Sequence, residues 1–143
     1  MQRTVPATFW IVAILGLLWN LYGLAMFWIN LTITPEAIAA LPEVERQVTL
    51  AMPRWILLPF GLATGAGVLG MLGLLLRRRW SAPVLLVSLL ALAVQFAAVY
   101  LTTPVWALSG VVGALFPVVL CLVALGLWLD ARHAAARGWL RPA

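Results

Sequence analysis

The sequence predicts an all-α polytopic membrane protein, with four transmembrane helices and one short amphipathic helix at the membrane surface between the first and the second. Two observations carry this prediction. The 143 residues are 65% hydrophobic and 9% charged, whereas a soluble domain is about 45–50% apolar and about a quarter charged. The apolar residues also form four long uncharged runs, each near the roughly 20 residues that cross a bilayer as a helix. We therefore treat residues 1–143 as a single four-helix membrane domain.

The first uncharged run, residues 7–30, predicts the first transmembrane helix. A cleaved signal peptide is the rival interpretation, but its apolar core would be about 7–15 residues long and would end in a small-residue cleavage site. This run is longer, ends in Phe27-Trp28-Ile29-Asn30 and precedes three similar runs. We therefore expect a helix that is retained.

Residues 31–54 form the one sizeable polar loop, which we expect on the outer side of the membrane. Thr34-Pro35-Glu36 is typical of a helix start, with a hydroxyl cap, a proline at the first position and an acid in the first turn. Apolar residues then recur every three or four positions, at Ile38, Leu41, Val44 and Val48. This spacing predicts a short amphipathic helix lying on the membrane, which Pro42 should break or kink.

The other three apolar runs predict spans over residues 55–76, 82–101 and 111–129, with a short loop over 102–110 and a polar tail over 130–143. The second span is rich in glycine. Its Gly61 and Gly65 form a pair of small residues four apart, a spacing that lets two helix backbones approach closely. Pro117 lies well inside the fourth span and is expected to kink it.

The arginines predict the orientation of the chain. Four spans place both termini on one side, and seven of the nine arginines fall there: Arg3, Arg77, Arg78, Arg79, Arg132, Arg137 and Arg141. Only Arg46 and Arg54 fall on the other side. Because positive residues stay inside, both termini are expected in the cytoplasm. The net charge of +5 does not indicate nucleic-acid binding, since the arginines lie at the ends of apolar runs and not on one polar face.

Several segments resemble a group of small, functionally uncharacterised four-span proteobacterial inner-membrane proteins. The resemblance rests on residues 17–23, 34–43, 67–80 and 136–140, and it covers most of the chain. It implies the four-span fold and a bacterial inner (plasma) membrane. Some members carry a loose label of sugar transporter, without defined site residues.

Asn20 is the first candidate for a functional side chain. It shares one face of the first span with Gly16 and Gly23, which we expect to pack against a neighbouring helix. Trp19 and Tyr22 flank Asn20 and are further candidates for a ligand path or interhelical polar contacts. An amide that faced lipid would lack a hydrogen-bond partner, so Asn20 is expected to face another helix or a cavity. The residue either contacts a ligand or makes an interhelical hydrogen bond, which contributes on the order of 0.6 kcal/mol.

Gln95, in the third span, has the same two interpretations, and Asn20 is its candidate partner because the two lie at similar depths. No Asp, Glu, Arg or His falls inside a predicted span, which argues against a proton-coupled exporter. Asp130, His133 and Arg137 could share a helix face, but a metal site needs more ligands and catalysis needs a nucleophile with a base. We therefore expect no enzyme, no metal and no cofactor.

Two functions follow from these features. The first is an accessory or structural subunit of a membrane assembly that acts through helix packing, as the glycine face of the second span indicates. The second is a small oligomeric transporter or facilitator for a small neutral solute such as a sugar, with Asn20 and Gln95 along its path. The expected partners are the lipid bilayer and either further copies of this chain or another membrane subunit.

Overall fold

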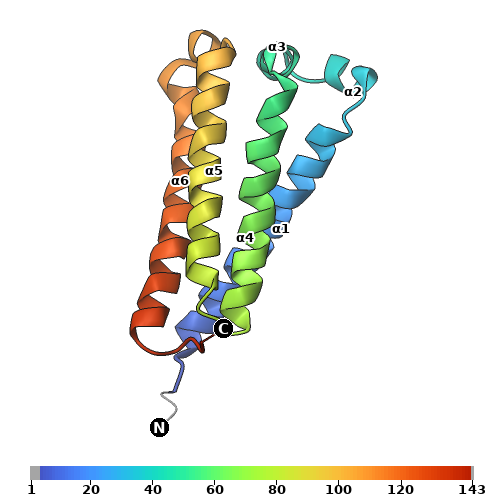
Figure 1. Cartoon of the computed structure of the whole chain (residues 1–143). Coiled ribbons are helices and arrows are strands. Elements are labelled where there is room, and N and C mark those ends of the chain that lie inside the picture. Colours follow the sequence, from blue (N-terminus) through green and yellow to red (C-terminus); the bar gives the residue numbers. More distant parts are fainter. Residues whose placement is uncertain (1–3, 143) are drawn as a thin grey trace.

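A computed structural model describes residues 4–142 and shows a bundle of four long helices with short helices at one end (Figure 1). The elements are α1 (Ala7–Leu31), α2 (Pro35–Ala39), α3 (Glu43–Ala51), the 3₁₀ helix η1 (Arg54–Ile56), α4 (Leu57–Leu75), α5 (Ser81–Thr102) and α6 (Val105–Ala136). The helices α1, η1 with α4, α5 and α6 are each long and apolar enough to cross a membrane. The predicted all-α class with four transmembrane helices is thus confirmed, and the chain is a multi-pass membrane protein.

The two ends of the bundle differ. The described chain begins and ends at one end, which we call the terminal end, and α2 and α3 lie at the other, which we call the loop end (Figure 1). Arg3, one of the seven arginines assigned to the terminal side, lies outside the described residues.

The polar segment at the loop end folds into two short helices, where the sequence predicted one that Pro42 breaks or kinks. Thr34 Oγ1 accepts a hydrogen bond of 3.2 Å from the Ala37 amide and so caps α2, with Pro35 as its first residue. Pro42 provides the N-cap of α3, because proline fixes φ but donates no amide hydrogen. On the apolar face of α3, Val48 packs near the buried Ile56.

The four long helices follow one another in a row. Helix α4 packs against α1 and α5, and α5 packs against α6, whereas α1 and α6 touch sparsely. Along α6, the buried residues among those described are Ala131 and Ala134, near the terminal end. The rest of its surface is mostly apolar, as hydrocarbon requires.

Helix α6 extends beyond both ends of the predicted fourth span. It begins at Val105, so the predicted loop over 102–110 shortens to a turn at Thr103 and Pro104, and it continues to Ala136 through residues predicted as polar tail. Its backbone departs from helical geometry at Gly110 (φ 55°, ψ −146°), whereas Pro117 keeps helical dihedrals. The departure from helical geometry therefore lies at Gly110, where a positive φ is accessible to glycine at little steric cost, and the kink at Pro117 stays a prediction.

The residues after α6 fold back onto the turn between α4 and α5. The Arg79 amide donates a hydrogen bond of 3.1 Å to the Arg141 carbonyl, and Arg77 Nε donates one of 2.8 Å to the Trp139 carbonyl. Leu140 is 3% exposed and joins an apolar cluster that includes Phe9. The polar tail is therefore a docked segment that ties three parts of the chain together at the terminal end.

Candidate functional site

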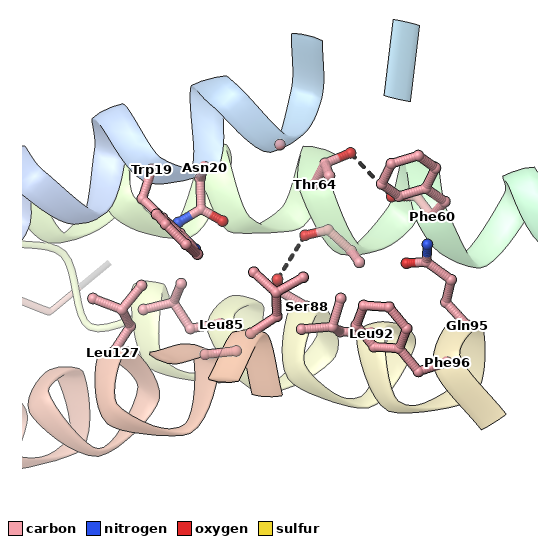
Figure 2. A pocket seen from close by; sticks show the side chains of 14 residues that line it. Trp19, Asn20, Phe60, Thr64, Leu85, Ser88, Leu92, Gln95, Phe96 and Leu127 are labelled. Carbon is pink, nitrogen blue, oxygen red and sulfur yellow. Dashed lines mark hydrogen bonds between the residues drawn. The ribbon is translucent and has the colours of Figure 1, made fainter. Parts of the chain in front are cut away.

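A cavity of about 100 Å³ lies inside the bundle, lined by residues from all four long helices (Figure 2). Its lining is mostly apolar, with four polar side chains: Asn20 from α1, Thr64 from α4, and Ser88 and Gln95 from α5. No charged side chain is among the lining residues of the described chain. The cavity is therefore lined by both polar residues that the sequence singled out, and it lies among helices long enough to cross a membrane.

Asn20 is held on the wall between α1 and α4. Its Nδ2 donates a hydrogen bond of 2.7 Å to the Gly16 carbonyl, one turn earlier in its own helix. Its Oδ1 lies against Gly67 so closely that a Cβ on that glycine would be 1.9 Å away. The amide hydrogen bond is therefore local, within α1, and the missing side chain at Gly67 makes room for the oxygen.

The two hydroxyls of the cavity donate to backbone carbonyls. Thr64 Oγ1 donates a hydrogen bond of 3.0 Å to the Phe60 carbonyl of its own helix. Ser88 Oγ donates one of 2.6 Å to the Ala63 carbonyl and so links α5 to α4 (Figure 2). Serine and threonine in helices commonly make such backbone bonds, but the bond from Ser88 crosses between helices.

Gln95 carries the buried polar atom of the cavity lining that has no hydrogen-bond partner among the described residues. The side chain is 9% exposed, and among residues 4–142 its buried Oε1 has no hydrogen-bond partner. A buried oxygen without a partner costs about 1–3 kcal/mol, so such atoms call for water, an ion or a ligand. The unpaired oxygen belongs to a residue that lines the cavity.

The structure does not join Gln95 to Asn20. Within the described chain no hydrogen bond links them, and Figure 2 shows their side chains well apart along the cavity. Ser88 lies near Gly67, which Asn20 contacts. Gln95 follows seven residues later on α5, or about 10 Å along the axis at 1.5 Å per residue. The predicted partnership between the two amides is absent.

The two aromatic residues beside Asn20 have different surroundings. Trp19 lines the cavity and is still 40% exposed, so it stands between the cavity and the outer surface of the bundle. Tyr22 is exposed and does not line the cavity. Of the two aromatic candidates, Trp19 alone belongs to the site.

Of the four glycines predicted to pack against other helices, three do so in the described chain and Gly65 does not. A Cβ on Gly16 would lie 2.4 Å from Met71 Cε, one on Gly23 would lie 3.2 Å from Thr64 Cγ2, and one on Gly61 would lie 2.9 Å from the Phe27 ring. These three glycines are therefore in close contact with neighbouring helices. A Cβ on Gly65 would meet no atom of the described chain within 4 Å, so the predicted pair Gly61 and Gly65 does not act as one contact.

Sequence reasoning missed the glycines that pack most closely along α4. Gly67, Gly70 and Gly73 are buried, and a Cβ at each would fall within 3 Å of Asn20, Leu85 or Trp80. Their spacing of three residues was the available signal, because residues three apart share one face of a helix. That face contacts α1 and α5 through Asn20, Ser88 and Leu85, which line the cavity.

Comparisons with known proteins give no counterpart: no family model, no curated protein and no solved structure matches the chain. The resemblance to four-span inner-membrane proteins therefore stays a prediction. Within the described residues, no three His, Cys, Asp or Glu side chains gather as a metal site would require. The functional argument rests on the cavity.

Proposed function

We propose that this protein is a membrane facilitator for a small neutral solute, which binds in the cavity between the four long helices. The observation that carries the proposal is Gln95 Oε1, a buried acceptor without a protein partner on a residue that lines the cavity. The absence of charged residues from the described lining favours an uncharged solute, because a charge at mid-membrane depth needs a partner.

The volume of the cavity limits the size of the solute. About 100 Å³ corresponds to roughly three waters at 30 Å³ each, and pockets for drug-sized ligands start near 300 Å³. A molecule of a few heavy atoms suits this space, whereas a sugar requires the helices to move apart. Apolar clusters around Met71 at the terminal end and around Ile56 at the loop end lie on either side of the cavity, so passage of any solute requires helix movement.

Osmotic flux tests the proposed function. Liposomes containing the purified protein are mixed rapidly with hyperosmotic glycerol, urea or glucose, and light scattering reports solute entry. We expect faster entry of glycerol or urea than in protein-free liposomes, and no added flux for Gln95→Leu. Gln47→Leu, on the exposed face of α3, is the matched control and should keep the flux. Equal flux from the wild type and Gln95→Leu would contradict the proposal.

The hypothesis of an accessory or structural subunit has less support from the packing. The glycine face of the second span motivated it, yet Gly61, Gly67, Gly70 and Gly73 contact other parts of this chain. Among the glycines of α4, Gly65 is the one with open space beside it in the described chain. Native mass spectrometry after mild detergent extraction tests the hypothesis: a complex with a different chain supports it, and the chain alone counts against it.

We also propose a bacterial inner-membrane location with both termini in the cytoplasm. The arginine turn at residues 77–79 and the arginines of α6 and the tail gather at the terminal end, whereas Arg46 and Arg54 belong to the loop end (Figure 1). This asymmetry supports the orientation through the preference of arginine for the cytoplasmic side.

Labelling of single cysteines checks the orientation. In a Cys121→Ala background, Glu45→Cys on α3 and Arg137→Cys at the end of α6 place thiols at exposed positions of opposite ends. A membrane-impermeant maleimide applied to intact cells should label the first variant and should label the second after permeabilisation alone. The reverse pattern would invert the topology.

A further inference from the structure

The polar oxygens of the cavity can accept more hydrogen bonds than the protein donates to them. A hydroxyl has one hydrogen and two lone pairs, and the hydrogens of Thr64 and Ser88 already bond to the Phe60 and Ala63 carbonyls. Each of these oxygens can therefore still accept a hydrogen bond. Together with Gln95 Oε1, they give the cavity three oxygens that can accept from a ligand, and of these Gln95 Oε1 is the one without any partner in the described chain.

We infer that the solute is a short uncharged polyol. This inference rests on the proposed function and narrows its small neutral solute to one chemical class. Several hydroxyls supply the donors that the acceptors along α4 and α5 need. A hydroxyl also accepts, so it matches the donor Nε2 of Gln95 beside Oε1. An ether or ketone of the same size accepts only, and it would leave Gln95 Oε1 buried and unpaired.

The apolar lining fits the carbon atoms of such a ligand. Phe60, Leu92 and Phe96 line the cavity close to Gln95 (Figure 2), so a hydroxyl on the carboxamide places its carbon chain against apolar side chains. An ammonium group would also donate, but no anionic side chain is among the described lining residues to pair with it. The volume of about 100 Å³ restricts the ligand to a short chain.

The side-chain amide of Gln95 reports directly on the predicted contact. The chain has three glutamines, so selective ¹⁵N-glutamine labelling gives three side-chain amide signals from protein in lipid nanodiscs. The Gln95 signal is the one that Gln95→Leu removes, or that Gln95→Asn removes if the leucine variant does not fold. Gln47, on the exposed surface of α3, is the internal control for effects of the solvent.

Two probes of equal size separate donation from acceptance. Glycerol has three hydroxyls, and 1,2-dimethoxyethane has the same number of heavy atoms without a donor. We expect glycerol to shift the Gln95 amide in a saturable way and the ether to bind about tenfold more weakly, which corresponds to one buried hydrogen bond. Ser88→Ala should weaken glycerol binding without removing it.

Two results would overturn the inference. An equal shift of the Gln95 amide signal with both probes would mean that the cavity does not prefer ligands with hydrogen-bond donors. No shift at high glycerol concentration would mean that the cavity holds water alone. The outcome is independent of the flux assay. A shift of the Gln95 amide signal without glycerol flux would contradict the facilitator function and support the polyol as ligand. Glycerol flux without such a shift would support the facilitator function and contradict the polyol as ligand of Gln95.

Discussion

Gly70→Ala is expected to lower the free energy of unfolding by about 1–3 kcal/mol, the usual cost of an extra methyl group in a close-packed interior. A Cβ at this position would lie 2.6 Å from Leu85 Cγ and 3.3 Å from the Leu85 backbone nitrogen. Neither atom is the free end of a flexible side chain. Helices α4 and α5 must therefore move apart, and the wall of the cavity moves with them.

Gly65→Ala is the matched control for this prediction. It makes the same chemical change on the same helix, but its Cβ would meet no atom of the described chain within 4 Å. The gain in helix propensity, up to about 1 kcal/mol, is common to both variants. Unfolding in mixed micelles, followed by tryptophan fluorescence, should separate the two. Equal unfolding midpoints for the two variants would show that the close approach of α4 to α5 at Gly70 does not contribute to stability.

Leu140→Ala should destabilise the terminal end by about 2–5 kcal/mol, the range for truncating a buried leucine. Leu140 is 3% exposed and packs in the cluster that contains Phe9, Met71 and Ala134. Because it follows the last helix, its truncation should also release the backbone pairing between Arg141 and the arginine turn. Hydrogen exchange at the Arg79 and Arg141 amides should therefore become faster.

Leu76→Ala provides the comparison at the same end of the bundle. Leu76 is 66% exposed, so its truncation removes little packing and should leave both stability and exchange close to wild type. Similar losses in the two leucine variants would contradict the view that the tail is docked. Unchanged exchange at Arg79 in Leu140→Ala would show that the backbone pairing holds without the leucine.

Local signals in the sequence were sufficient for the helices themselves. Four uncharged runs predicted four long helices, because hydrophobic length alone decides whether a segment suits a bilayer. Thr34 and Pro35 marked the start of α2, and Pro42 marked the break before α3. These features depend on neighbours within one turn, since capping and proline geometry act over a few residues.

The ends of α6 were harder to predict from local patterns. The sequence placed a loop over 102–110 and a tail from residue 130, yet the helix extends from Val105 to Ala136. Polar residues at a helix end are compatible with both a helix and a tail. Ala131 and Ala134 are buried against the cluster at the terminal end, and that contact with distant residues favours the helix.

The arrangement of the candidate site depended on tertiary structure more than the positions of the helices did. Asn20 and Gln95 were visible as polar residues in apolar runs, and the sequence by itself determined that each must avoid lipid. The structure decided that they line one cavity without touching, that Gly67 receives Asn20, and that Gln95 Oε1 stays unpaired. Hydrophobicity and backbone sterics are properties of a local segment, and they fix which segments are helices. Which faces meet depends on the side chains of several helices packing together, and no one segment contains that information.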